Sequence, residues 1–158
     1  MLGFFPIILK DKLILGHRTS ESIGAVPGHI RAFNVYSGKI EWIFHTIPYP
    51  GEFGYETWPQ DAYLKSGGAN AWSGFSLDLK NEIVYISTGS AAFDYYGGDR
   101  EGSNLFANSI IALNPNDGSR LWHYQVTHHD IWDRDLPAAP NLIDIQIKEK
   151  KVKYLAKI

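Results

Sequence analysis

One motif occurs twice in this chain and constrains its fold more than any other feature of the sequence. Its pattern is A-x-N-x-x-x-G-x-x-x-W, and the copies at 32–42 and 112–122 lie 80 positions apart (112 − 32). In each copy we expect the Ala to end a strand, the Asn and Gly to form a tight turn, and the Trp to lie on the next strand. A single hairpin cannot bury that Trp, so such units must stack side by side. The repeat therefore predicts the blades of a β-propeller, with two unrelated hairpins in a β-sandwich as the alternative.

Short strands account for most of the remaining sequence. Helical periodicity is nearly absent, and an aromatic content of 14% favours strands. Runs rich in β-branched and aromatic residues recur between turn residues, and in some of them apolar side chains alternate, as at 40, 42 and 44. The predicted strands are 12–16, 29–34, 40–45, 72–78, 83–87, 109–114, 120–125, 141–147 and 152–158.

The two ends of the chain, its net charge and its lack of Cys bear on which segments, partners and sites the protein can have. The first nine residues are apolar but contain Gly3 and Pro6, so we interpret 6–16 as the entry to a strand rather than as a signal peptide or membrane span. Both ends lack a closing turn, and we expect an internal piece of a larger propeller; a complete small domain is the alternative. A net charge of −2 gives no electrostatic case for a nucleic-acid partner. The absence of Cys excludes a disulfide framework and a thiolate metal site in this segment.

The densest group of chemically versatile side chains is the run 128–135. It contains two His, three Asp, one Arg and one Trp directly after the strand that carries Trp122. Carboxylates beside a cation can serve as bases or as metal ligands. Adjacent His side chains cannot both reach one metal from a strand, which argues against zinc. A solvated, salt-bridged turn is the alternative.

Three smaller groups and two long loops are further candidates. In 67–74, glycines on both sides of Trp72 would let the backbone approach a flat ligand that the indole stacks on, although Trp72 can equally be a core residue. The groups 87–90 and 20–22 end strands and can equally be plain turns. The loops 46–68 and 91–108 exceed what a blade needs, and long structured loops on a β scaffold often carry a site.

Taken together, these segments resemble the pyrroloquinoline quinone (PQQ)-dependent dehydrogenases, in the branch of the quinoprotein glucose dehydrogenases. The repeat is similar to the tryptophan-docking motif of that family, in which the third position is usually Asp rather than Asn. The resemblance spans almost the whole chain and is carried by the segments Ser20-Glu-Ser, Gly28-His-Ile-Arg-Ala-Phe, Phe44-His-Thr-Ile-Pro, Pro50-Gly-Glu-Phe-Gly-Tyr-Glu-Thr-Trp-Pro, Gly67-Gly-Ala-Asn-Ala-Trp, Thr88-Gly-Ser-Ala, Asn104-Leu-Phe-Ala-Asn and His128-His-Asp-Ile-Trp-Asp-Arg-Asp-Leu-Pro.

The resemblance implies an all-β fold that is part of an eight-bladed β-propeller. Each blade would be a four-stranded antiparallel sheet with a tryptophan-docking motif, and PQQ and a calcium ion would lie on the propeller axis. Residues 1–158 would form about two to three blades, with no separate second domain.

The resemblance also implies roles for individual residues. Asp133 matches the catalytic carboxylate that takes the proton of the substrate hydroxyl. Trp72 matches the indole that stacks on the quinone, and Asn70 and Ser22 would also contact the cofactor. Four other residues of the run would support its structure; they are His128, His129, Asp130 and Asp135.

The implied calcium ligands are Glu21, Ser90 and Asp133. Many relatives have an Asn at the position of Ser90, and a serine hydroxyl is a poorer ligand for a hard cation than a carboxamide oxygen.

The implied function is oxidation of a sugar hydroxyl, of glucose or another aldose. A carboxylate base would remove the hydroxyl proton while hydride moves to the quinone, with calcium as Lewis acid. Electrons would pass to a quinone or cytochrome acceptor, at or facing the periplasm, and the parent protein could associate with a membrane. The segment alone would be inactive. The alternatives are a PQQ-dependent alcohol or polyol dehydrogenase and a non-catalytic propeller scaffold.

Overall fold

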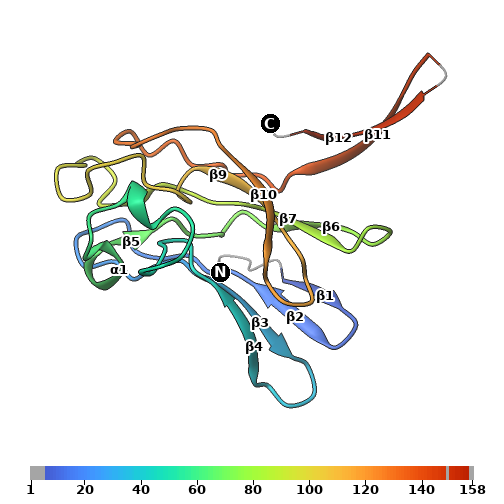
Figure 1. The fold of residues 1–158 in the computed structure, drawn as a ribbon, viewed down its shortest axis with the longest axis horizontal. Coiled ribbons are helices and arrows are strands. Elements are labelled where there is room, and N and C mark those ends of the chain that lie inside the picture. Colours follow the sequence, from blue (N-terminus) through green and yellow to red (C-terminus); the bar gives the residue numbers. More distant parts are fainter. Residues whose placement is uncertain (1–5, 149, 157–158) are drawn as a thin grey trace.

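The computed structural model describes residues 6–148 and 150–156, and most of its regular structure is antiparallel β-sheet (Figure 1). The first four-stranded sheet has the order β1-β2-β3-β4 and consists of β1 (Ile7–Leu9), β2 (Lys12–Leu15), β3 (Ile30–Asn34) and β4 (Ile40–Phe44). The second has the order β10-β9-β7-β6 and consists of β6 (Phe75–Asp78), β7 (Ile83–Ser87), β9 (Ser109–Leu113) and β10 (Arg120–Gln125).

Smaller elements lie between and after these strands. A hairpin of β11 (Asn141–Ile147) and β12 (Lys150–Ala156) projects from the end of the second sheet (Figure 1). The two long loops contain η1 (Tyr55–Thr57), α1 (Ala62–Lys65) and the short paired strands β5 (Gly67–Gly68) and β8 (Ala91–Ala92). Among the described residues, no helix has the length and apolar character needed to cross a membrane.

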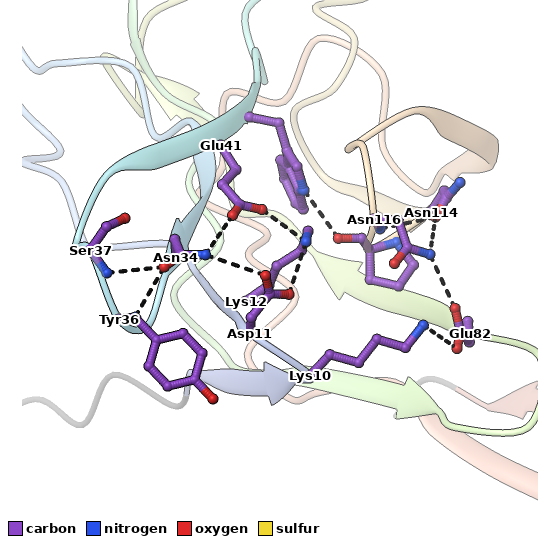
Figure 2. A network of polar contacts seen from close by, with 12 residues as sticks. Lys10, Asp11, Lys12, Asn34, Tyr36, Ser37, Glu41, Glu82, Asn114 and Asn116 are labelled. Carbon is purple, nitrogen blue, oxygen red and sulfur yellow. Dashed lines mark hydrogen bonds and ion pairs between the residues drawn. The ribbon is translucent and has the colours of Figure 1, made fainter.

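Both copies of the repeat form the same turn. Asn34 and Asn114 each accept a backbone hydrogen bond from the glycine four residues later, Gly38 at 2.8 Å and Gly118 at 2.9 Å. Both glycines lie in the left-handed region, with φ of 68° and 73°. The Asn side-chain oxygen also accepts backbone N–H groups within its own turn, as Figure 2 shows for Asn34. The predicted roles of Asn and Gly are therefore confirmed.

The first repeat docks onto the second through its Trp. Trp42, on β4, donates a hydrogen bond from Nε1 to the carbonyl oxygen of Pro115 at 3.1 Å. A Cβ added to Gly118 would lie only 2.6 Å from the indole ring of Trp42, so the absent side chain is what lets the ring approach. Trp122, the equivalent residue on β10, is 39% exposed. This arrangement is that of stacked blades.

An apolar core and a polar network join the two sheets. Ile14 and Ile30 of the first sheet share one buried cluster with Ile86 and Ile111 of the second. At the turns, Lys10 forms a 2.6 Å ion pair with Glu82 across the gap between the sheets (Figure 2). The two sheets thus form a continuous body.

The predicted strands agree with observed strands in position, although the short strands β5 and β8 were not predicted and residues 157–158 of the strand predicted at 152–158 lie outside the described residues. Two further differences concern the start of a strand. The segment 6–16, predicted to be the entry to a strand at 12–16, forms that strand as β2 and adds a second one, β1, because Lys10 adopts a left-handed turn with φ of 56°. The strand predicted from Trp72 begins only at Phe75, since Gly74 lies at φ 98° and interrupts the extended chain. Trp72 is therefore in an irregular segment.

Candidate active site

A cavity of about 270 Å³ brings together five of the six residues predicted to form the site. They come from four separate segments of the chain: after β2, after β5, after β7 and after β10. The five are Glu21, Asn70, Trp72, Ser90 and Asp133. The sixth, Ser22, lines a different cavity of about 310 Å³. Its carbonyl oxygen accepts a hydrogen bond from Ala25 N in a turn, which places it next to that second cavity.

The segment that holds Trp72 and Asn70 depends on close backbone packing. A Cβ on Gly68 would overlap the backbone nitrogen of Ala92 and lie 2.6 Å from the carbonyl oxygen of Ser90. A Cβ on Gly28 would likewise overlap the backbone and Cβ of Asn70. Because both positions are glycine, the loop fits against its neighbours and presents Trp72 and Asn70 to the cavity.

The indole of Trp72 is half-buried and has a fixed polar partner. Its Nε1 donates a hydrogen bond to Oδ2 of Asp135 at 2.8 Å. Trp72 and Asp135 both line the cavity. A flat ligand beside Trp72 would thus meet an aromatic side chain held by a carboxylate.

Asp133 combines partial burial with an unusual charge environment. Burial raises the pKa of its carboxyl, and the negative charges of Asp135, Glu21 and Asp130 raise it further. A hydrogen bond with Tyr95 acts in the opposite direction. A raised pKa makes a carboxylate a stronger base, which suits proton abstraction.

Beneath the cavity, Asp130 organises the loop that carries Asp133. It is buried, and its Oδ2 accepts hydrogen bonds from Ser90 Oγ at 2.6 Å, Arg134 N at 2.6 Å and Asn108 Nδ2 at 3.1 Å. Burial alone would raise the pKa of Asp130, but these bonds lower it below its ordinary value. Asp130 is therefore an ionised structural anchor.

The same network occupies the hydroxyl group of Ser90. Its Oγ donates to Asp130 and accepts a hydrogen bond from Asn108 Nδ2 at 3.0 Å. A calcium ion at Ser90 would have to share an oxygen that already has two partners. The role of Ser90 as a metal ligand stays a prediction.

One further carboxylate lines the cavity, Asp94, which the sequence did not single out. It is 3% exposed, and among the described residues its Oδ2 has no hydrogen-bond partner. Burial, together with the charges of Asp133, Glu21 and Asp135, raises its pKa to about 7, and Arg100 opposes them. Its only sequence signal is its place in the long loop 91–108, because burial of one side chain in an irregular loop has no periodic pattern.

The oxygen donors of the cavity fit a hard cation. Glu21, Asp94 and Asp133 are carboxylates of the type that calcium binds, and a bound cation would relieve the repulsion that raises the pKa of Asp94 and Asp133. Over residues 6–148 and 150–156, however, no three acidic or His side chains are already gathered at metal-binding distances. Calcium therefore fits the chemistry of the donors, while the carboxylates would have to close around it.

Residues 4–158 match the family described as glucose/ethanol/alcohol dehydrogenase, beta-propeller domain, designated PQQ. The chain belongs to this family. The predicted β-propeller fold is thereby confirmed, and the β-sandwich alternative is wrong.

Individual relatives in the PQQ family include both glucose and alcohol dehydrogenases. The chain is 36% identical over 151 residues to a quinoprotein glucose dehydrogenase of Gluconobacter oxydans, covering 91% of this chain and 18% of the relative. It is 32% identical over 166 residues to quinohemoprotein alcohol dehydrogenase ADH IIB of Pseudomonas putida, covering 95% and 23%. The solved structure of the quinohemoprotein alcohol dehydrogenase ADHIIG of Pseudomonas putida HK5 superimposes with a TM-score of 0.83 at 29% identity, covering 96% of this chain and 24% of that one.

These matches have two consequences. The chain spans about a fifth of the length of the curated relatives it matches. The sugar and alcohol enzymes are similarly close, so membership of the PQQ-dependent dehydrogenases is established at the level of the family rather than of one substrate.

Proposed function

We propose that the protein containing these residues is a PQQ- and calcium-dependent dehydrogenase that oxidises a sugar hydroxyl, of glucose or another aldose. One observation carries the proposal: Asp133, Trp72 and Asn70 lie around one cavity although they come from segments distant in the sequence. A scaffold propeller would have no physical reason to place a raised-pKa carboxylate beside an aromatic side chain in this way.

Each side chain of the cavity has a separate role in the proposed reaction. When bound, PQQ would supply the hydride acceptor for the reaction, and calcium would supply a Lewis acid. Asp133 removes the proton from the substrate hydroxyl, and its raised pKa makes that transfer more favourable. Trp72 supports the flat cofactor, and Asn70 contacts its polar edge.

The cation would be held by carboxylates of the cavity. Glu21 and Asp133 are the predicted ligands, and Asp94 adds a buried oxygen that lacks a partner among the described residues. A bound cation would favour the ionised forms of Asp94 and Asp133, whose pKa values are raised in its absence. Ser90 would contribute a weaker contact through its shared hydroxyl.

The remaining parts of the proposal concern the whole protein. Electrons pass to a quinone or cytochrome acceptor, and the reaction takes place in, or facing, the periplasm. A PQQ-dependent alcohol or polyol dehydrogenase is the second candidate, favoured by the 32% identity to an alcohol dehydrogenase over 95% of this chain.

The test is reconstitution of the full-length chain with PQQ and calcium, followed by a dye-reduction screen of aldoses and alcohols. The first proposal expects aldose-dependent reduction that is lost when PQQ is omitted. Activity with alcohols alone would support the second candidate. A chain that binds no PQQ under these conditions would be a scaffold, and both enzyme proposals would be wrong.

A further inference from the structure

The carboxylate of Asp135 connects two elements of the site. Its Oδ2 accepts the hydrogen bond from Trp72 Nε1 at 2.8 Å, and its Oδ1 accepts one from the backbone nitrogen of Ser90 at 2.7 Å. The first donor is 63 residues away in the sequence and the second is 45. A single side chain thus ties the indole to the loop after β7.

The chain also leaves a space of the right shape for this carboxylate. A Cβ added to Gly89 would overlap Asp135 Oδ1 and lie 2.9 Å from its Cγ. The backbone of Gly89 is outside the left-handed region, so its conformation does not require glycine. What requires glycine at position 89 is the room taken by Asp135.

We propose that Asp135 is a positioning residue that fixes the plane of the Trp72 indole against the cofactor. The inference rests on the proposed function, since it takes Trp72 as the surface on which PQQ stacks. A hydrogen bond to a charged acceptor is stronger than one between neutral groups, and it acts on the ring edge, where it limits rotation of the indole. An indole that is held in one plane before binding loses less conformational entropy when the cofactor binds, and this strengthens binding.

The rival role for Asp135 is that of a cation ligand, because it lines the same cavity as Asp133 and Glu21. Both of its oxygens accept hydrogen bonds in the described part of the chain, whereas Asp94 has an oxygen with none. The two hydrogen bonds support a positioning role, but each carboxylate oxygen has a second lone pair, so calcium affinity is what separates the two roles.

A double-mutant cycle on the full-length protein tests the proposal. The variants are Asp135→Ala, Trp72→Phe and the pair together, and the measurement is the dissociation constant of PQQ by titration at saturating calcium. Phenylalanine keeps an aromatic face but has no N–H for Asp135 to hold. With Trp72 intact we expect Asp135→Ala to weaken PQQ binding by roughly threefold to tenfold, because the freed indole must then be ordered when the cofactor binds. In the Trp72→Phe background the same change should alter the constant by less than about twofold.

A second variant, Gly89→Ala, perturbs the position of the Asp135 carboxylate and leaves its charge in place. Gly89→Ala should displace Asp135 and weaken PQQ binding only where Trp72 is intact. If Asp135→Ala fails to fold by circular dichroism, the cycle of Gly89→Ala with Trp72→Phe decides the question. Asp144→Ala, on exposed β11, is the matched carboxylate control and should leave PQQ affinity unchanged.

Three results would overturn the inference. Equal losses of PQQ affinity in the two backgrounds would show that Asp135 acts independently of the indole. A parallel loss of calcium affinity, measured without PQQ, would make Asp135 a cation ligand. Failure of the unmutated protein to bind PQQ would overturn the proposed function and this inference with it, and that result is distinguishable because it precedes any substitution.

Discussion

The substitution Gly118→Ala tests the docking of one blade on the next. Two separate costs follow from the structure. Gly118 has a φ of 73°, where an L-residue is strained, and the added Cβ would lie 2.6 Å from the ring of Trp42. Gly51 offers a matched control, because it has a φ of 88° but nothing within 4 Å of an added Cβ.

The two costs have different sizes. A left-handed conformation costs an L-residue about 1–2 kcal/mol, and Ala returns roughly 0.4–1 kcal/mol by restricting the unfolded chain. Gly51→Ala should therefore lower the free energy of unfolding by at most about 1.6 kcal/mol. Overpacking typically adds about 1–3 kcal/mol, so Gly118→Ala should lower it by roughly 1–4.6 kcal/mol.

Urea unfolding followed by Trp fluorescence measures the difference. We expect the midpoint for Gly118→Ala to fall clearly below that for Gly51→Ala, with the emission of the folded state altered only in the first variant. Equal midpoints would refute the docking of Trp42 on this turn.

Two further predictions concern buried titratable groups. Burial, with the charges of His45, Arg31 and His17, lowers the pKa of His29 from 6.5 to about 3. Between these two pH values the His29 side chain is protonated in the unfolded chain but neutral in the folded chain. The free energy of unfolding therefore falls as the pH drops from 6.5 towards 3. At pH 5 the loss of unfolding free energy amounts to about 2 kcal/mol. The variant His29→Gln should therefore flatten the dependence of the urea midpoint on pH between 7 and 5. An unchanged slope would exclude His29 as the cause of this dependence. The pKa of Asp94 is about 7 in the folded chain and 3.8 in the unfolded chain, so between these pH values the folded chain keeps a proton that the unfolded chain loses. The free energy of unfolding therefore falls as the pH rises from 3.8 through 7. At pH 7.5 in EDTA, Asp94→Asn should then raise the free energy of unfolding by about 1 kcal/mol or more. The same substitution should reduce the stabilisation of the protein by calcium. A melting temperature in EDTA below that of the unmutated protein would contradict this prediction.

The fold could be predicted from the sequence largely because its signals are local. The Asn and Gly of each repeat make contacts within a few residues, so their turn is encoded where it forms. The docking of Trp42 follows from the same motif, since an indole on an edge strand needs a neighbour to cover it. The β1–β2 hairpin was missed because a left-handed Lys10 gives no turn signal comparable to Gly or Asn.

The candidate site was only partly predictable. Resemblance located Trp72, Asn70 and Asp133, and the structure brings them to one cavity. It did not show that Ser22 faces a neighbouring cavity, because the direction of a side chain in a turn depends on local hydrogen bonds. Nor did it reveal Asp94, whose burial is set by segments distant in the sequence.

The substitution Asp133→Asn tests the central claim most directly. It keeps the size of the side chain and removes the base, and a general base typically contributes ~10²–10⁴-fold to the rate. The measurement is steady-state dye reduction by the full-length protein, alongside a PQQ titration of the same preparation. We expect turnover to fall by about 10²-fold or more while PQQ remains bound. Full activity in the Asp133→Asn variant would contradict the assignment of Asp133 as the base.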